Sequence, residues 1–331
     1  MVIPIYAAGP EAVGLLRQAL DRLKDSSFQD FEVWVADDAS PEGEAIWDAA
    51  AASGAKLIRL ERRYGPATAR NAAARKAAAP ILAFLDADTS VHPDTLERLV
   101  QKLRDHPELD AVMGSYDRQP AAPGIVSRFR NLLHSFVHHR ASRRAWTFWA
   151  GCSAIRRERF LALGGFDENF PQPSIEDVEF GFRLRAAGGS IELDPEIQVK
   201  HHKRWTLRSM VHTDLFARAI PWAALLYRHP IPLDLNFKTS DRISVLLTAI
   251  APLAAGVALL RGGAWWLAPV AALVAIAVLN AALFRFLARA TSRMEAALCF
   301  PLLLVYLATC VAGLAAGIVL AARPKRAYGA A

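Results

Sequence analysis

Three long apolar stretches without a charged residue limit the possible fold of this chain more strongly than anything else in it. They occupy residues 243–260, 264–284 and 296–320. Each is about as long as a helix must be to cross a bilayer, roughly 17–25 residues. A single stretch of this kind also suits a buried core helix, but three in succession favour a membrane region. We therefore expect a membrane region over residues 242–331, with spans near these three stretches.

The charge of the chain is divided unevenly between this region and the rest. Residues 238–331 hold nine Lys and Arg and two acidic residues, which accounts for the whole net charge of +7. The other residues hold 30 basic and 30 acidic side chains. Basic residues beside apolar spans favour the cytoplasmic face and anionic lipid headgroups. The pI of about 9.5 thus reflects the membrane region, and we expect no nucleic-acid partner.

The orientation of the spans leaves one alternative open. The N-terminal segment lacks the basic and then apolar pattern of a signal peptide, so we expect a cytoplasmic soluble domain on a multi-pass protein of the inner membrane. Two crossings then put the arginines of 285–293 inside, whereas a third puts the basic residues of 323–326 outside, against the charge rule. Either that rule fails here, or the third stretch, which contains a proline and two glycines, does not cross fully. We expect three crossings.

Strand and helix patterns alternate through the first part of the chain. The strand patterns are "VIPIY", "FEVWVADDAS", "AKLIRLE" and "ILAFLDADT", and the helical patterns between them are "EAVGLLRQALDRLKD", "EGEAIWDAAAAS" and "GPATARNAAARKAAA". Such alternation predicts an α/β fold with a mainly parallel sheet. Ligands of these sheets bind at the carboxyl ends of the strands, which is where Asp37, Asp38, Asp86 and Asp88 fall.

Asp86 and Asp88 suit a hard divalent cation. Mg²⁺ and Mn²⁺ prefer oxygen ligands and commonly take one or two carboxylates together with substrate phosphates. Taken alone, an Asp-x-Asp triplet is weak support for a metal site, because it occurs by chance in many chains. Its position directly after an apolar strand is what makes the interpretation useful.

Two further segments lie between the first strands and the membrane region. The segment "SRFRNLLHSFVHHRASRRAW" has apolar residues at helical spacing with Arg and His on its other faces, so it is either an ordinary surface helix or one that lies on the membrane or lines an acceptor site. Residues 213–241 mix aromatic, proline and charged residues, which favours an interfacial amphipathic linker. We therefore expect a soluble domain over 1–212, in two halves at 1–110 and 111–212.

Several motifs together resemble the family 2 glycosyltransferases, inverting enzymes of the GT-A fold. The similar blocks are "VIPIY", "VADDAS" with Ala39 in place of glycine, "GPATARNAAARKAAAPILAFLDADT", "GGFDENF", "SIEDVEFGFRLRAAGGSIELDP" and "HHKRW". They follow the order of the family and cover roughly residues 2–205. The last block is a partial match, because His201 stands where the family usually has Gln or Arg. This departure argues against processive polymer synthesis.

The resemblance implies that 1–212 is a catalytic domain, with a nucleotide-sugar half at 1–110 and an acceptor and base half at 111–212. It also implies a set of site residues. The nucleotide sugar would contact Pro4, Tyr6, Asp37, Asp38, Arg70, Asn71 and Asp86. A divalent cation, Mn²⁺ or Mg²⁺, would bind Asp88, Asp86 and His201, with His202 as the alternative histidine. The acceptor or the diphosphate would contact Gly151, Cys152, Arg204 and Trp205. The donor would be a UDP-linked or GDP-linked sugar.

The resemblance also implies that Asp177 is the catalytic base, with Glu176 beside it to orient it. Inverting transfer needs one carboxylate that takes the proton of the attacking hydroxyl. The structural alternative is an ordinary helix start, in which Ser174 caps the helix and acidic residues fill the first turn. With the upstream motifs present, we favour the catalytic role.

These expectations together describe a membrane-anchored glycosyltransferase. It would move a sugar from a nucleotide donor to an acceptor embedded in the bilayer, either a lipid alcohol or a polyprenyl phosphate. A polysaccharide synthase is an alternative, disfavoured by the partial motif and the small number of spans. A non-catalytic membrane protein that binds nucleotide sugars is another, disfavoured because Asp86, Asp88 and Asp177 are all present.

Overall fold

The computed structural model describes residues 1–228 and 238–322 of the chain. The chain divides into two compact units, Met1–Arg204 and Trp205–Ala331, here called unit 1 and unit 2. The predicted catalytic domain continues to residue 212, a short way past this division. Part of the predicted linker and the basic residues of 323–326 lie outside the described residues.

Unit 1 contains the sheet and the first seven helices. Its strands are β1 (Val2–Ile5), β2 (Trp34–Asp37), β3 (Lys56–Arg59), β4 (Ile81–Leu85), β5 (Thr89–Val91), β6 (Ala111–Tyr116), β7 (Cys152–Arg156) and β8 (Ile191–His201). Its helices are α1 (Pro10–Lys24), α2 (Gly43–Ala52), α3 (Pro66–Lys76), α4 (Thr95–Asp105), α5 (Ile125–Arg140), α6 (Arg157–Ala162) and α7 (Glu176–Ala186). The strands and helices predicted over the first 85 residues are all present.

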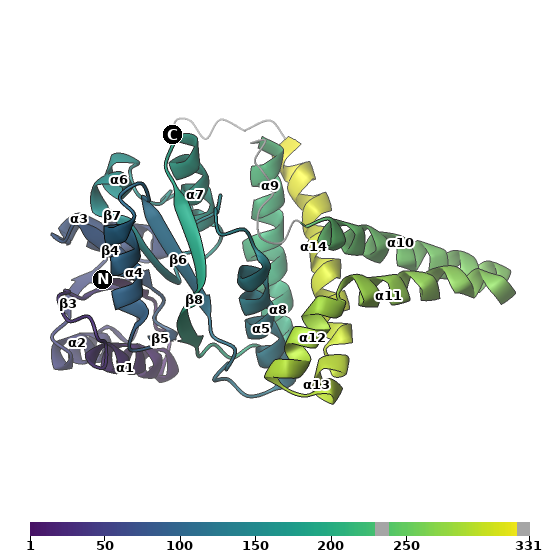
Figure 1. The fold of residues 1–331 in the computed structure, drawn as a ribbon, viewed down its shortest axis with the longest axis horizontal. Coiled ribbons are helices and arrows are strands. Elements are labelled where there is room, and N and C mark those ends of the chain that lie inside the picture. Colours follow the sequence, from purple (N-terminus) through teal and green to yellow (C-terminus); the bar gives the residue numbers. More distant parts are fainter. Residues whose placement is uncertain (229–237, 323–331) are drawn as a thin grey trace. The chain divides into compact units, whose positions relative to one another are not determined.

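The strands form one sheet in the order β3-β2-β1-β4-β7-β6-β8-β5 (Figure 1). The first four strands of this order run parallel, and β6 and β8 are also parallel. Strand β7 is antiparallel to both of its neighbours, and β5 is antiparallel to β8. The prediction of an α/β fold with a mainly parallel sheet is therefore confirmed. The carboxyl ends of β1, β2 and β4 lie at the same edge of the sheet.

A cluster of phenylalanines supports the strand that carries the second acidic pair. Phe84, on β4, lies two residues before Asp86, and its ring contacts the rings of three others at centroid distances of 5.1–6.2 Å. The cluster consists of Phe84, Phe148, Phe160, Phe166 and Phe180, all nearly fully buried. Edge-to-face aromatic packing of this kind adds stability beyond the buried area. The end of β4 is thus held on a rigid part of the core.

The described part of unit 2 is helical. Its elements are α8 (Leu207–His212), the π-helical segment η1 (Thr213–Ala219), α9 (Ile220–Arg228), α10 (Thr239–Arg261), the 3₁₀ segment η2 (Gly263–Trp266), α11 (Leu267–Leu279), α12 (Ala281–Ala290), α13 (Arg293–Leu298) and α14 (Phe300–Ala322). Within the described residues, two helices are long and apolar enough to cross a membrane, Thr239–Arg261 and Arg293–Ala322. A third span is formed only if α11 and α12 count as one broken helix.

The second predicted span is interrupted at Asn280. Its side-chain amide donates to the carbonyl of Ile276 over 2.8 Å and to the hydroxyl of Ser244 over 2.9 Å. Side chains that bond the backbone locally compete with helix continuation. The helix changes direction there by 57° between the segments on either side. The apolar stretch over 264–284 is therefore a helix followed by a turn into a second helix.

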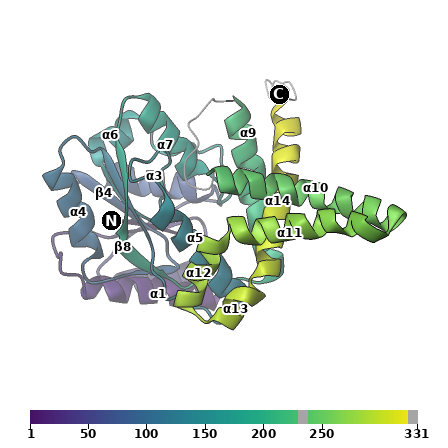
Figure 2. The same ribbon diagram turned by 45° about the vertical axis from the view of Figure 1, so that its right-hand side comes forward.

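The third predicted span is one long helix in spite of its proline and glycines. Pro301 stands in the first turn of α14, where its missing N–H leaves no bond unmade. A Cβ at Gly313 would collide with Ala219 of η1, and one at Gly317 with Ala223 of α9, so the two glycines permit close approach of η1 and α9 (Figure 2). The described part of the predicted linker that precedes α10 is thus a helix packed on α14.

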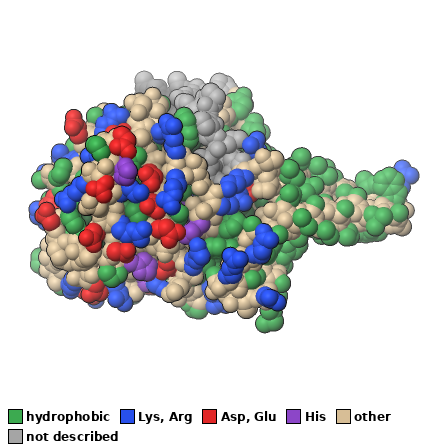
Figure 3. Space-filling model, viewed as in Figure 1, with side chains coloured by type: hydrophobic (Ala, Val, Ile, Leu, Met, Phe, Trp, Pro, Cys, Tyr) green, Lys and Arg blue, Asp and Glu red, His purple; other side chains and the backbone are tan. Residues whose placement is uncertain are grey.

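The α10–α11 hairpin exposes apolar side chains along its length (Figure 3). Leu253, Leu259, Leu260, Leu267 and Val278 are each 68–87% exposed. A continuous apolar surface of this extent on a protein marks contact with a membrane or another protein. Together with its length and composition, the hairpin is consistent with membrane association.

Candidate active site

Arg70 is the central residue of the site that the structure assembles in unit 1. Its guanidinium donates to Glu176 Oε1 over 2.9 Å and to Asp86 Oδ1 over 2.7 Å, and its side chain is 7% exposed. It therefore joins α3, the end of β4 and the start of α7. Glu176 lies 106 positions further along the sequence. A buried guanidinium bound on both sides fixes the relative positions of the two acidic motifs.

Asp177 follows Glu176 in the first turn of α7. Its carboxylate accepts the backbone N–H of Ala150 over 3.1 Å and that of Val178 over 2.8 Å. Burial, and then the charge of Glu176, raise the pKa of Asp177 to about 7, although Arg70 acts in the opposite direction. The cap by Ser174, considered as the alternative to a catalytic role, is not formed. Ile175 occupies the N-cap position, and the Ser174 N–H donates to Glu176.

Asp88, which directly precedes β5, meets His201, the last residue of the neighbouring strand β8. Asp88 Oδ2 and His201 Nε2 are 3.5 Å apart. The other ring nitrogen of His201 lies 2.7 Å from Asn131 Oδ1, and the ring stacks on Tyr116 at a centroid distance of 4.1 Å. Because an amide oxygen accepts hydrogen bonds, Asn131 places a proton on Nδ1, so Nε2 is the ring nitrogen left for other contacts. This nitrogen points toward Asp88.

The charge around Asp88 differs from that around Asp86. Burial tends to raise the pKa of Asp88, but His201 and Lys203 prevail and hold it at about 2. Burial raises the pKa of Asp86 also, with Asp88 adding to the rise and Arg70 opposing it. Asp88 is thus the carboxylate that stays ionised without help from a guanidinium.

The protein groups that could bind a metal here suit a cation that also takes ligands from a substrate. Within residues 1–228 and 238–322, no three His, Cys, Asp or Glu side chains lie close enough to form a metal centre by themselves. Asp88 and His201 supply an oxygen and a nitrogen, whereas Asp86 is turned toward Arg70. Mn²⁺ and Mg²⁺ often bind through one or two protein groups plus phosphate oxygens. The predicted three-residue set stays a prediction, and two of its members meet.

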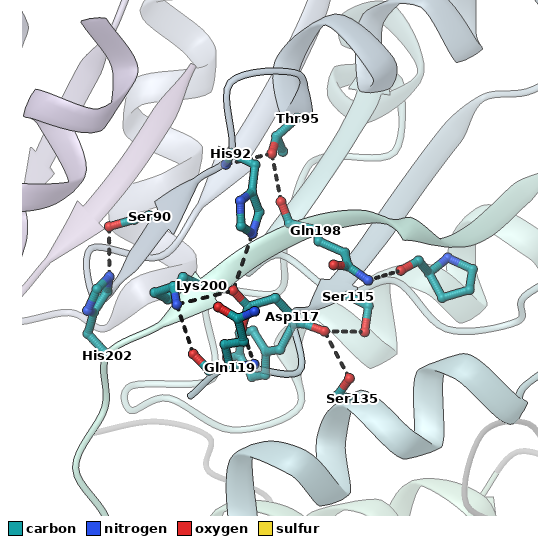
Figure 4. Close-up of polar contacts among 12 residues, drawn as sticks. Ser90, His92, Thr95, Ser115, Asp117, Gln119, Ser135, Gln198, Lys200 and His202 are labelled. Atoms are coloured by element: carbon teal, nitrogen blue, oxygen red, sulfur yellow. Dashed lines mark hydrogen bonds and ion pairs between the residues drawn. The ribbon is translucent and has the colours of Figure 1, made fainter. Parts of the chain in front are cut away.

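His202 takes part in different contacts from those of His201. Its Nε2 lies 2.8 Å from the hydroxyl of Ser90, and Figure 4 shows the ring directed toward that residue. In the same view Asp117 lies between His92 and Lys200, at 3.3 Å and 3.6 Å. These contacts stabilise the pairing of β5 with β8. Of the two histidines considered in the sequence, His201 is the one whose ring faces the Asp88 carboxylate, whereas His202 donates its backbone N–H to the Asp88 carbonyl over 2.9 Å.

The first acidic pair has partners within the protein. Asp38 accepts the backbone N–H groups of Tyr64 and Gly65 over 2.7 and 2.9 Å, which holds the loop before α3. Asp37 accepts the Ser40 N–H over 2.9 Å and pairs with Arg59. Both carboxylates are buried. Their contacts are those of residues that shape the carboxyl ends of β2 and β3.

Three other residues expected at the nucleotide have varied surroundings. Pro4 is buried inside β1, where it pairs with Ala36. Tyr6 follows β1, is 37% exposed, and has the guanidinium of Arg63 over its ring at 3.9 Å. Asn71 is bound through its side chain to the main chain of Phe166 in both directions. Of these three, Tyr6 is the one with a side chain accessible to a ligand.

The residues expected at the acceptor or diphosphate are also placed. The Gly151 carbonyl accepts the backbone N–H of Asp86 over 3.4 Å, which ties the start of β7 to the acidic loop. Cys152 is buried in β7, and burial raises its pKa to about 12. Arg204 is exposed at the end of unit 1, and Trp205 is a buried residue of unit 2.

Two residues of this site were missed in the sequence. Asn131 and Tyr116 orient and support His201, and both are buried. Asn131 lies on α5, in the segment first interpreted as a surface or membrane helix, whereas α5 packs on β6 and β8. The available signal was an amide on the apolar side of that helix, next to Leu132. Tyr116 ends a buried strand and gave no comparable signal.

This arrangement defines the class of protein. A mainly parallel α/β sheet with acidic residues at the end of a central strand, joined to an acidic helix start, is the GT-A type of nucleotide-sugar transferase fold. The model of glycosyl transferase family 2 matches residues 1–164, and that of the N-terminal domain of galactosyltransferase matches residues 130–205. The chain belongs to glycosyl transferase family 2.

Individual relatives agree with this assignment. The chain is 27% identical over 265 residues to validoxylamine A glucosyltransferase of Streptomyces hygroscopicus subsp. jinggangensis, covering 67% of this chain and 60% of that protein. It is 28% identical over 165 residues to probable N-acetylgalactosaminyltransferase 9 of Caenorhabditis elegans, covering 44% and 28%. The chain thus spans three fifths or less of the length of these relatives.

A solved structure has the same fold. The mannosyltransferase PcManGT from Pyrobaculum calidifontis, in complex with GDP-Man and Mn²⁺, superposes with a TM-score of 0.53 at 20% identity. The match covers 96% of this chain and 86% of that one. At this identity the similarity establishes the fold.

Proposed function

We propose that the chain is a membrane-associated glycosyltransferase that moves a sugar from a nucleoside-diphosphate donor to an acceptor in the bilayer, with inversion at the sugar carbon. The observation that carries this proposal is the bridge from Asp86 through Arg70 to Glu176. It holds the strand end expected to bind the donor and the helix expected to provide the base in one rigid arrangement. Precise placement of reacting groups is a large part of catalysis.

Asp177 acts as the base in this proposal. Its two backbone donors fix its orientation, and a pKa of about 7 means that the carboxylate binds a proton strongly enough to take it from a hydroxyl. Glu176 is held by Arg70 and contributes the charge that raises the pKa of its neighbour. One base and no covalent nucleophile suit a direct displacement.

The donor would bind at the end of β4 with a divalent cation. Asp88 and His201 would hold the cation, with Asn131 keeping the Nε2 lone pair of His201 available. A bound Mn²⁺ or Mg²⁺ would offset the negative charge that develops on the leaving diphosphate. The loops that Asp37 and Asp38 hold, together with the exposed ring of Tyr6, would surround the nucleoside. The related mannosyltransferase structure contains GDP-Man and Mn²⁺, which supports a UDP-linked or GDP-linked donor.

The acceptor would be a lipid alcohol or a polyprenyl phosphate. Unit 2 supports this part of the proposal, because its apolar hairpin and α14 would keep the enzyme at the surface where such acceptors are found. The soluble unit would lie in the cytoplasm, where nucleotide sugars are made, at the inner membrane. A multi-pass arrangement follows from the α10–α11 hairpin.

The test is release of nucleotide and transfer of sugar by the full purified chain. A panel of UDP-linked and GDP-linked sugars is assayed with Mn²⁺ or Mg²⁺ in the presence of a lipid extract. We expect metal-dependent release that requires lipid. The Asp177→Asn variant should lose about 10²–10⁴ of the rate, as for other general bases. Because only ionised Asp177 can accept the proton, kcat/KM of the wild type should rise with pH through about 7.

The matched control is Asp105→Asn, which removes an exposed carboxylate at the end of α4. It should transfer at the wild-type rate. Full activity of Asp177→Asn would disprove the base, and release that is independent of metal would disprove the cation. Folded protein that releases no nucleotide from any donor would favour a non-catalytic binding protein.

A further inference from the structure

Helix α12 separates apolar and basic residues onto two sides. Leu283 and Leu287 are each 1% exposed and pack inside unit 2. Arg285 and Arg289 are exposed and four residues apart, so they lie on one side of the helix. Arg293, also exposed, begins α13 just beyond. Arg285 and Arg289 are one turn apart on α12, and Arg293 follows the break between α12 and α13; these three residues are here called the arginine stripe.

The arginine stripe follows directly on the apolar hairpin. Helix α12 starts at the 57° bend where α11 ends, and Asn280 at this bend binds Ser244 near the start of α10. The start of α10 and the end of α11 are therefore held together by this bond. Helix α12 begins at the same place, as Figure 2 shows. If the hairpin lies in a bilayer, this point is the boundary between hydrocarbon and water.

The stripe lacks internal charge partners. No hydrogen bond or ion pair is present for the side chains of these three arginines within the described part of the chain. Residues 238–331 contain two acidic residues, Asp241 and Glu295. Next to the stripe, Met294 and Leu298 are 75% and 58% exposed. Exposed arginines alternating with exposed apolar side chains are typical of a helix in the headgroup layer.

We propose that Arg285, Arg289 and Arg293 form a binding site for the headgroups of anionic phospholipids. The guanidinium group binds phosphate oxygens in pairs, which favours it over a simple point charge for this ligand. Met294 and Leu298 would insert among the acyl chains beside the bound headgroups. The proposal depends on the membrane location stated above and is independent of the catalytic chemistry.

The test compares lipid binding to the full chain purified in a neutral detergent. Phosphatidylglycerol and phosphatidylcholine are titrated separately, and the bound lipids are counted by native mass spectrometry. We expect the wild type to prefer phosphatidylglycerol. The Arg285→Gln/Arg289→Gln/Arg293→Gln variant should bind it roughly tenfold to a hundredfold more weakly, because each basic residue near a membrane surface adds severalfold. Binding of phosphatidylcholine should not change.

The matched control is Arg17→Gln/Arg22→Gln/Arg104→Gln, which removes the same charge from exposed positions of unit 1. It should keep the preference. The proposal is overturned if the wild type shows no preference, if the first variant keeps it, or if both variants lose it equally. Displacement of the lipid by inorganic phosphate would also overturn it, since the site would then bind free anions.

Two measures keep the result independent of folding and of the proposed function. If the triple variant does not fold, Arg285→Gln and Arg289→Gln are tested singly, and each should lower the preference severalfold. An unchanged preference in both would overturn the proposal. Lipid binding is measured without donor or acceptor, so a failure of sugar transfer leaves this result standing.

Discussion

The two acidic strand ends look alike in the sequence but have different surroundings in the structure. Asp37 and Asp38, after β2, are bound by backbone N–H groups and by the half-exposed Arg59. Asp86 and Asp88, after β4, face the buried Arg70 and the ring of His201. The first pair shapes loops. The second pair is connected to side chains from three other elements, and these are the side chains that would carry the chemistry.

This difference shows how to separate a structural carboxylate from a functional one. A carboxylate satisfied by main-chain N–H groups holds a local turn, and its removal affects the fold first. A carboxylate held by the side chains of distant residues connects elements, and its removal affects the site first. The following expectations test this distinction.

Replacement of one carboxylate by an amide in each acidic pair should give the largest difference between the two pairs. Asp88→Asn removes a ligand, so metal affinity should fall by more than the roughly 10–100-fold contributed by outer partners. Transfer should fall about a thousandfold, which corresponds to several kcal/mol of charge stabilisation. Asp38→Asn should keep the metal affinity and lose about 1–3 kcal/mol of stability, because an amide NH₂ would face the N–H of Tyr64 or Gly65.

The measurements are Mn²⁺ binding by electron paramagnetic resonance in the presence of a nucleoside diphosphate, and chemical denaturation. Equal loss of Mn²⁺ affinity in the two variants would show that the distinction between the pairs is wrong.

Removal of the arginine that binds each acidic pair should give the next largest difference, which is one in the free energy of unfolding. Arg70→Met leaves the buried Glu176 and the partly buried Asp86 without their cation, which typically costs about 3–5 kcal/mol. Arg59 is 47% exposed in its side chain, and its buried carboxylate partner Asp37 keeps the Ser40 N–H, so Arg59→Met should cost less, about 1–3 kcal/mol. Arg75→Met, an exposed change on the same helix as Arg70, is the control. Denaturation midpoints of the three variants decide the order, and similar values for Arg70→Met and Arg59→Met would contradict it.

Substitution of Asn131 should change metal binding at the second acidic pair, Asp86 and Asp88, and should leave the first pair unaffected. Asn131→Ala removes the acceptor that fixes the proton on His201 Nδ1, so the metal affinity should fall about 10–100-fold. Asn131→Asp retains an acceptor oxygen and should restore most of the affinity. Tight Mn²⁺ binding by Asn131→Ala would assign this residue a purely structural role. Nucleotide binding without metal should be the same in both variants.

The sequence predicted the parts of this molecule that depend on local pattern. The strand and helix periods over the first 85 residues, and the acidic residues at the ends of β2 and β4, are visible in the order of residues. The bridge from Arg70 to Glu176 is not, because it joins positions 106 residues apart through the folded core. The break at Asn280 was missed for a similar reason, since its side chain binds Ser244 on another helix.

Ala39 offers the smallest and most local test of the first pair. It has φ of +56°, and it follows the two carboxylates whose turn it closes. A side chain in this region costs about 1–2 kcal/mol, whereas glycine loses about 0.5–1 kcal/mol of chain entropy on folding. Ala39→Gly should therefore stabilise the chain by about 0.5–1 kcal/mol without changing Mn²⁺ affinity. Ala51→Gly, on the exposed side of α2, should destabilise it by up to about 1 kcal/mol. Denaturation of both variants would show whether the turn after β2 is strained. A loss of stability in Ala39→Gly would mean that the surrounding hydrogen bonds, and not the backbone angle, set the energy of this turn.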